Sequence, residues 1–117
     1  MTAPQDLPYT IAGREFVAQI PGLRVQILTL DYAERIPWHY HSVVHDIFVC
    51  MEGTTIVETK TPPTRHELAP GDHCIVNPMK AHEVSCKGAK GCKFIIIQGI
   101  GEHDFCKPGR GTVDASK

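Results

Sequence analysis

Residues 37–53 read PWHYHSVVHDIFVCMEG, and residues 71–82 read GDHCIVNPMKAH. In the first segment, His39 and His41 are two residues apart and are followed by the carboxylate of Asp46. Side chains two apart on a strand point to the same face, so both imidazoles can reach one ion at about 2.0–2.2 Å. The second segment adds His82, just after a turn that contains Pro78. Three imidazoles and a carboxylate form a candidate metal site, a donor set that suits Fe, Mn, Ni, Zn or Cu.

Short apolar runs alternate with turn signals on both sides of these segments, and no helical periodicity is sustained. This pattern predicts an all-β chain. We expect strands at residues 16–20, 23–32, 47–51, 54–59, 73–76, 82–86 and 92–100. The intervening turns, such as residues 61–64 and 87–91, are rich in Pro or Gly. Hairpins in succession imply antiparallel pairing, in two packed sheets or in one sheet closed into a small barrel.

The length of 117 residues, 42% of them hydrophobic, suits one domain with a single core. The strand pattern stops at Gly101, where Gly, Pro and charged residues become dominant. We therefore expect an N-terminal arm (residues 1–14), a barrel (15–100) and a C-terminal tail (101–117). The two ends would lie on the surface or on a partner subunit.

Charge and apolar patterning argue against two classes of partner. The chain has 12 Lys and Arg against 13 Asp and Glu without a basic block, so we expect no nucleic acid as a partner. Its apolar runs are too short to span a bilayer, and its start does not resemble a signal peptide. We expect no membrane partner and a cytoplasmic location.

Five cysteines, an odd number without a CxxC pair, fit reduced thiols in that compartment. Cys86 and Cys92 flank residues 87–91, so their thiols could face each other across a hairpin. We expect them to be ordinary free thiols.

The two opening segments resemble the two motifs of the cupin family, G-x5-H-x-H-x3–4-E-x6-G and G-x5-P-x-G-x2-H-x3-N. His39, His41 and Gly53 match the first motif, and Gly71 and His82 match the second. The chain departs from the pattern at Ala33, Asn77, Met79 and Cys86, which belong to loops and turns, and at Asp46, which replaces the family's Glu. The resemblance implies a single antiparallel β-barrel, a double-sheet jelly roll, with one divalent metal ion per chain.

Asp46 and the neighbouring His45 both fit the permitted distance from His41, but the distance to Gly53 selects Asp46. Asp is one methylene shorter than Glu. Asp46 is therefore either a fourth metal ligand or an acceptor that orients a histidine or a bound water. If Asp46 points into the barrel, strand alternation turns Phe48 and Cys50 inward as candidate pocket walls.

The same alternation turns His45, Ile47, Val49 and Met51 outward. This apolar face must pack against something. In cupins, sheets often pair across a homodimer, so the resemblance implies a dimer; the N-terminal arm of the same chain is the alternative cover. By the same parity, Trp38 and Tyr40 point away from the metal. His66, His73 and His103 lack ligand spacing, and we expect none of them to touch the ion.

The resemblance implies a metal-dependent enzyme acting on a small organic substrate, either a dioxygenase or an isomerase or lyase. The alternatives are a non-catalytic module that binds or senses a small ligand, and a barrel whose histidines bind no metal. No residue is identified as catalytic beyond the ligands.

Overall fold

The structure, a computed structural model, describes residues 9–108, and this part of the chain contains strands and no helix. The strands are β1 (Gly13–Ile20), β2 (Leu23–Leu30), β3 (Ile36–His39), β4 (His45–Glu52), β5 (Thr55–Lys60), β6 (Pro63–Leu68), β7 (His73–Val76), β8 (His82–Cys86) and β9 (Cys92–Gly99). No helix in residues 9–108 has the length and hydropathy needed to cross a membrane.

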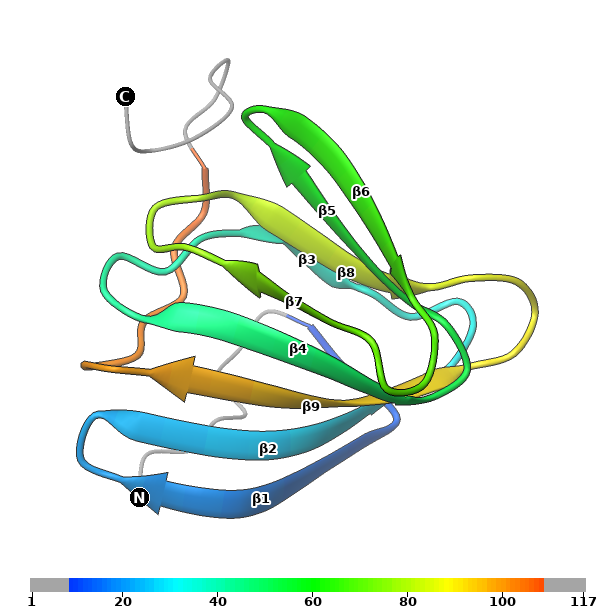
Figure 1. Cartoon of the computed structure of the whole chain (residues 1–117), viewed down its shortest axis with the longest axis horizontal. Coiled ribbons are helices and arrows are strands. Elements are labelled where there is room, and N and C mark those ends of the chain that lie inside the picture. Colours follow the sequence, from blue (N-terminus) through cyan, green and yellow to red (C-terminus); the bar gives the residue numbers. More distant parts are fainter. Residues whose placement is uncertain (1–8, 109–117) are drawn as a thin grey trace.

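The strands form two antiparallel sheets that face each other (Figure 1). One has the order β1-β2-β9-β4-β7 and the other the order β3-β8-β5-β6. Their inner faces enclose a core in which Phe48 and Phe94 are fully buried, with ring centroids 5.7 Å apart. The predicted all-β jelly roll is confirmed.

Strand alternation on β4 follows the prediction. Asp46, Phe48 and Cys50 are buried between the sheets, whereas His45 is exposed on the outer side. In the neighbouring strand β9, Gln98 lies directly opposite Asp46 in register. This pairing places an amide beside the carboxylate inside the barrel.

Strand β6 was not predicted. Residues 61 and 62 form a turn where residues 61–64 were expected to form one, but β6 begins at Pro63, inside the expected turn, and pairs with β5 from Lys60 onward. Pro63 is tolerated because it is the first residue of an edge strand, where a missing N–H costs no hydrogen bond in the ladder. Strand β3, of four residues, was also absent from the predicted strands.

Gly53 lies in the connection between β4 and β5. It has a φ of 72°, and a Cβ there would lie 2.5 Å from the carbonyl oxygen of Gly91. A side chain would therefore clash with the loop between β8 and β9, which explains why this position needs glycine. Beside the same loop, which connects the two sheets, the Sγ atoms of the free thiols Cys86 and Cys92 are 2.7 Å apart.

The chain after β9 is anchored to the barrel. Tyr40 and Cys106 form an isolated antiparallel bridge with two backbone hydrogen bonds of 3.0 Å. The Asp104 carboxylate accepts hydrogen bonds from the backbone N–H and the hydroxyl of Ser42. In Figure 1 this orange segment runs from the end of β9 past the loop between β3 and β4. Residues 101–108 thereby close one side of the barrel mouth.

Candidate metal centre

His39, His41, Asp46 and His82 gather inside the barrel, each with one possible ligand atom within 4.8 Å of the others. Their exposed fractions are 4%, 3%, 0% and 1%. Pairing of β3 with β8 puts His39 directly opposite His82, and Asp46 reaches them from the facing sheet. The structure thus brings together all four residues that the sequence selected, and it leaves the exposed His45 outside.

The Nδ1 atom of each imidazole faces a backbone carbonyl oxygen. The distances are 2.7 Å from His39 to Pro37, 2.5 Å from His41 to Asp104 and 2.8 Å from His82 to Lys80. A carbonyl oxygen only accepts hydrogen bonds, so Nδ1 carries the proton in all three rings. In a neutral ring, Nε2 then keeps its lone pair available for a metal ion.

Two of these Nε2 atoms lie beside a single carboxylate oxygen. Asp46 Oδ2 is 2.9 Å from His41 Nε2 and 3.0 Å from His82 Nε2. If both rings are neutral, each contact brings an Nε2 lone pair close to an oxygen that can only accept, which is repulsive. A second proton on the ring, or a cation among the three atoms, removes this repulsion. Two ligands with bonds of 2.0–2.2 Å at right angles lie about 3 Å apart, so these distances fit ligands of one ion.

The electrostatics keep Asp46 charged. Burial alone would raise its pKa, but His41 and His82, when their rings are protonated at both nitrogens, donate hydrogen bonds to Asp46 and hold the pKa well below its usual range. Burial lowers the pKa of His39, and the neighbouring rings of His82 and His41 lower it further. Burial also acts to lower the pKa of His41, but the hydrogen bond and charge of Asp46 raise it overall. The cluster therefore offers one carboxylate and a neutral His39 ring.

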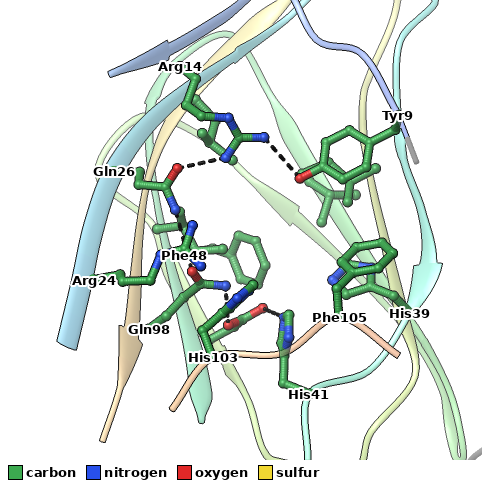
Figure 2. A pocket seen from close by; sticks show the side chains of 15 residues that line it. Tyr9, Arg14, Arg24, Gln26, His39, His41, Phe48, Gln98, His103 and Phe105 are labelled. Atoms are coloured by element: carbon green, nitrogen blue, oxygen red, sulfur yellow. Dashed lines mark hydrogen bonds and ion pairs between the residues drawn. The ribbon is translucent and has the colours of Figure 1, made fainter. Parts of the chain in front are cut away.

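A chain of hydrogen bonds holds Asp46 from the other side. Gln98 Nε2 donates to Asp46 Oδ1 at 3.0 Å, and Gln26 Nε2 donates to Gln98 Oε1 at 3.5 Å. Arg14 Nη1 donates to Gln26 Oε1 at 2.6 Å, and Nη2 donates to the hydroxyl of Tyr9 at 3.1 Å (Figure 2). From Arg14 to Asp46 every donor points toward the carboxylate. Oδ1 is thus occupied, and Oδ2 faces the imidazoles.

The sequence interpretation missed both glutamines. Gln26 and Gln98 are buried and face inward; the other inward residues of β9 are apolar, and Gln26 shares its face of β2 with Arg24 and two leucines. A buried amide must be hydrogen-bonded, so a glutamine at an inward position of an apolar strand was the signal available.

The chain after β9 supplies further pocket walls that the sequence did not reveal. The Phe105 ring stacks on His39 with centroids 4.3 Å apart and an interplanar angle of 14°, and the His103 ring lies 4.9 Å from that of His41. His103 lines the pocket but lies outside the cluster of four. Of the two predicted wall residues, Phe48 lines the pocket, whereas Cys50 belongs to the hydrophobic core.

Three residues that the sequence predicted to be away from the metal, His66, His73 and Trp38, lie outside the pocket. His66 and His73 are exposed, and Trp38 faces Lys60, whose Nζ lies 4.8 Å from the ring centroid.

The cavity beside the histidines has a free volume of about 20 Å³, enough for about one water molecule. An organic ligand that reaches the cluster therefore displaces side chains at the mouth, where Tyr9 and Phe105 lie 5.7 Å apart.

Comparison with protein families identifies the chain. Residues 26–98, more than half of the sequence, match the family model described as the cupin domain. The protein is a cupin. The match to this family confirms the resemblance seen in the two histidine motifs. Comparison with curated proteins gives no match.

Solved structures of other cupins have the same fold. KdgF from Halomonas sp. is 18% identical, with a TM-score of 0.65 over 86% of this chain and 94% of its own. A cupin-2 domain protein from Shewanella frigidimarina is 19% identical, with a TM-score of 0.63 over 81% and 87%. Oxalate oxidase in complex with glycolate is 12% identical, with a TM-score of 0.67 over 74% of this chain, which spans only 46% of that chain. At these identities the likeness concerns the fold.

Proposed function

We propose that this cupin binds one divalent metal ion through His39, His41, His82 and Asp46 and acts on a small organic substrate. One observation carries the proposal: three buried imidazoles have Nδ1 committed to a carbonyl, and two of their Nε2 atoms lie about 3 Å from one carboxylate oxygen. A cation among these atoms removes the repulsion between their lone pairs. The glycolate held by oxalate oxidase supports a small organic ligand.

We assign Asp46 as the fourth ligand through Oδ2. Gln98 already occupies Oδ1, and Oδ2 has the spacing to His41 and His82 that two ligands of one ion have. Four protein ligands leave positions open on an ion of higher coordination number, where water or substrate can bind. Bound there, a divalent ion would supply a Lewis acid, or a redox centre in the case of iron. Gln98 and the three carbonyls hold the ligands in place.

Metal analysis tests the proposal. We expect elemental mass spectrometry to find close to one equivalent of a transition metal in protein purified without added metal. The variant His82→Ala should lose this metal. His66→Ala is the matched control because His66 is exposed and distant from the cluster. Absence of metal in the wild type, together with a melting temperature that does not respond to added Fe, Mn, Ni, Zn or Cu, contradicts the proposal.

A second measurement separates catalysis from binding. Oxygen uptake by the iron-loaded protein, tested with thiols, catechols, diketones and keto acids, examines the dioxygenase form of the proposal. Product analysis with the Mn, Ni and Zn forms examines isomerase and lyase activity. Metal binding without turnover in any combination favours the non-catalytic module that binds or senses a ligand.

We propose in addition that the outer face of the five-stranded sheet forms a homodimer. Two apolar rows cross this sheet in register: Val25, Ile97, Ile47 and Ile75, and beside them Ile27, Ile95 and Val49. The residue Ile75, at one end of the first row, is 54% exposed. A continuous apolar face of this kind is typical of a surface that another protein covers, and a second copy offers the same face.

We also propose a cytoplasmic location, because the five cysteines are free thiols, as expected in a reducing compartment. Fractionation of the source cells tests it, and recovery of the protein outside the cytoplasm would contradict it.

A further inference from the structure

Two arginines line the same pocket as the histidines. Arg14 lies on β1 and Arg24 on β2, and Figure 2 shows both on the side of the pocket formed by Gln26 and Gln98. Within residues 9–108, neither guanidinium forms an ion pair with a carboxylate. This is unusual, because every other arginine in that part of the chain is paired with glutamate.

Arg24 has the greater unused capacity. Its side chain forms no hydrogen bond with any residue in the described range, and its Nε is buried without a partner. Its contact is with the Phe16 ring, whose centroid lies 6.0 Å from Cζ. Arg14, by contrast, donates to Gln26 and Tyr9 and is held in place by them. A guanidinium has five N–H donors, so a polar group that docks beside Arg24 meets donors that are not already in use.

The charge in the pocket is unbalanced. Two guanidiniums face one carboxylate, Asp46, and a divalent ion would add two further positive charges. Burial, and then repulsion from Arg14, lower the pKa of Arg24, as expected for two cations that line one partly buried pocket. Positive charge of this kind is costly unless an anion offsets it.

We propose that this pocket binds a substrate carrying a carboxylate, which pairs with Arg24, while the other end of the molecule faces the histidine cluster. This inference rests on the proposed metal-dependent function of the same site. A carboxylate matches the planar fork of a guanidinium with two parallel hydrogen bonds. Arg14, fixed by Gln26 and Tyr9, adds a second positive charge. The substrate class is therefore small organic acids.

Calorimetry with succinate and its diamide, succinamide, tests the charge preference. The two molecules have nearly the same shape, but succinamide has no carboxylate and no charge. We expect the zinc-loaded wild type to bind succinate at least about tenfold more tightly, because charge-assisted hydrogen bonds are worth more than neutral ones. Equal affinities, or no measurable binding of succinate, would overturn the proposal. Tighter binding of inorganic phosphate than of succinate would also overturn it, and would indicate a phosphate site instead.

Variants locate the preference. Arg24→Gln should lose it while keeping its metal content, and Arg24→Lys, which retains the charge but not the fork, should lose part of it. Arg35→Gln is the control, since Arg35 is 58% exposed and pairs with Glu83 away from the pocket. A preference for succinate that survives in Arg24→Gln contradicts the assignment. The wild-type comparison of the two probes needs no variant and stands even if Arg24→Gln fails to fold.

The same titrations on protein treated with EDTA separate this proposal from the metal site. If the protein binds no metal but still prefers succinate through Arg24, the proposed function fails and the carboxylate site stands. If metal binding is normal and the preference is absent, the carboxylate site fails and the proposed function stands.

Discussion

The Nε2 atom of His82 lies 3.0 Å from Asp46 Oδ2, and Nδ1 of the same ring lies 2.8 Å from the carbonyl oxygen of Lys80. A neutral imidazole has one N–H and cannot donate to both oxygens. His41 has the same arrangement, with Asp46 on one side and the Asp104 carbonyl on the other. The backbone therefore sets which nitrogen each ring presents, and Asp46 sets where the presented nitrogens meet.

Replacing Asp46 by asparagine should lower metal affinity by more than about 100-fold. The amide has nearly the same shape, but it lacks the charge and presents a weaker donor to the ion. Loss of a group that only orients a ligand costs about 10–100-fold, so a larger loss indicates direct ligation. Competition with a chromophoric chelator measures the affinity. A decrease within 10–100-fold would instead make Asp46 an acceptor that orients the histidines.

Gln98→Ala should weaken metal binding by about 10–100-fold, because Asp46 Oδ1 loses the amide that fixes the carboxylate. Asp46 Oδ1 would then be buried without its donor, and we expect this to lower the free energy of unfolding by about 1–3 kcal/mol. Chelator competition and urea unfolding measure the two effects. Gln19→Ala, at an exposed position of β1, is the control. Unchanged metal affinity in Gln98→Ala would show that the hydrogen-bond chain has no role in holding the metal.

Phe105→Ala should make the metal exchange faster while the four ligands remain. The Phe105 ring covers His39 at 4.3 Å, so its removal opens the pocket to water and chelator. We expect the rate of metal removal by EDTA to rise several-fold, together with a loss of stability of about 0.5–1.5 kcal/mol from the lost ring stacking. Tyr32→Ala, at an exposed aromatic residue, is the control. An unchanged rate would mean that the segment after β9 does not limit access.

Ile97→Glu should convert the proposed dimer into monomers. Ile97 lies opposite both Val25 and Ile47 at the middle of the outer face, where a buried, unpaired carboxylate is strongly unfavourable. Light scattering coupled to gel filtration measures the mass. Thr64→Glu, on the exposed edge strand of the other sheet, is the control and should leave the mass unchanged. A wild-type protein that is monomeric at micromolar concentration would contradict the proposal.

Alkylation of Cys86 should be slow at neutral pH and should accelerate as the pH rises. Burial, followed by the hydrogen bond with Cys92, raises the pKa of Cys86 to about 12, so the reactive thiolate is scarce below that pH. The rate with iodoacetamide should rise about tenfold per unit between about pH 8 and 10, whereas an ordinary thiol with a pKa of about 8.5 levels off in that range. Peptide mass spectrometry measures the rate. The control is the same peptide in urea; identical profiles in both states would contradict the raised pKa.

Local pattern alone predicted the inner and outer faces of β4. Because alternation has a period of two, selecting Asp46 also placed Phe48 and Cys50 inside and Ile47 and Val49 outside. The same logic paired His39 with His41, and the two histidine motifs supplied the family. It missed β6, which begins at the second proline of the turn, because the tolerance of an edge strand for proline is a property of the assembled sheet.

The sequence by itself indicated the fold and the four candidate ligands through its two histidine motifs, and strand alternation gave the apolar outer face. Only the tertiary structure decided what surrounds Asp46. Gln98 is 52 residues from Asp46, and Gln26 is 72 residues from Gln98. His103 and Phe105 reach the cluster because Cys106 pairs with Tyr40. Such neighbours follow from strand order and register across two sheets, and no local periodicity encodes that arrangement.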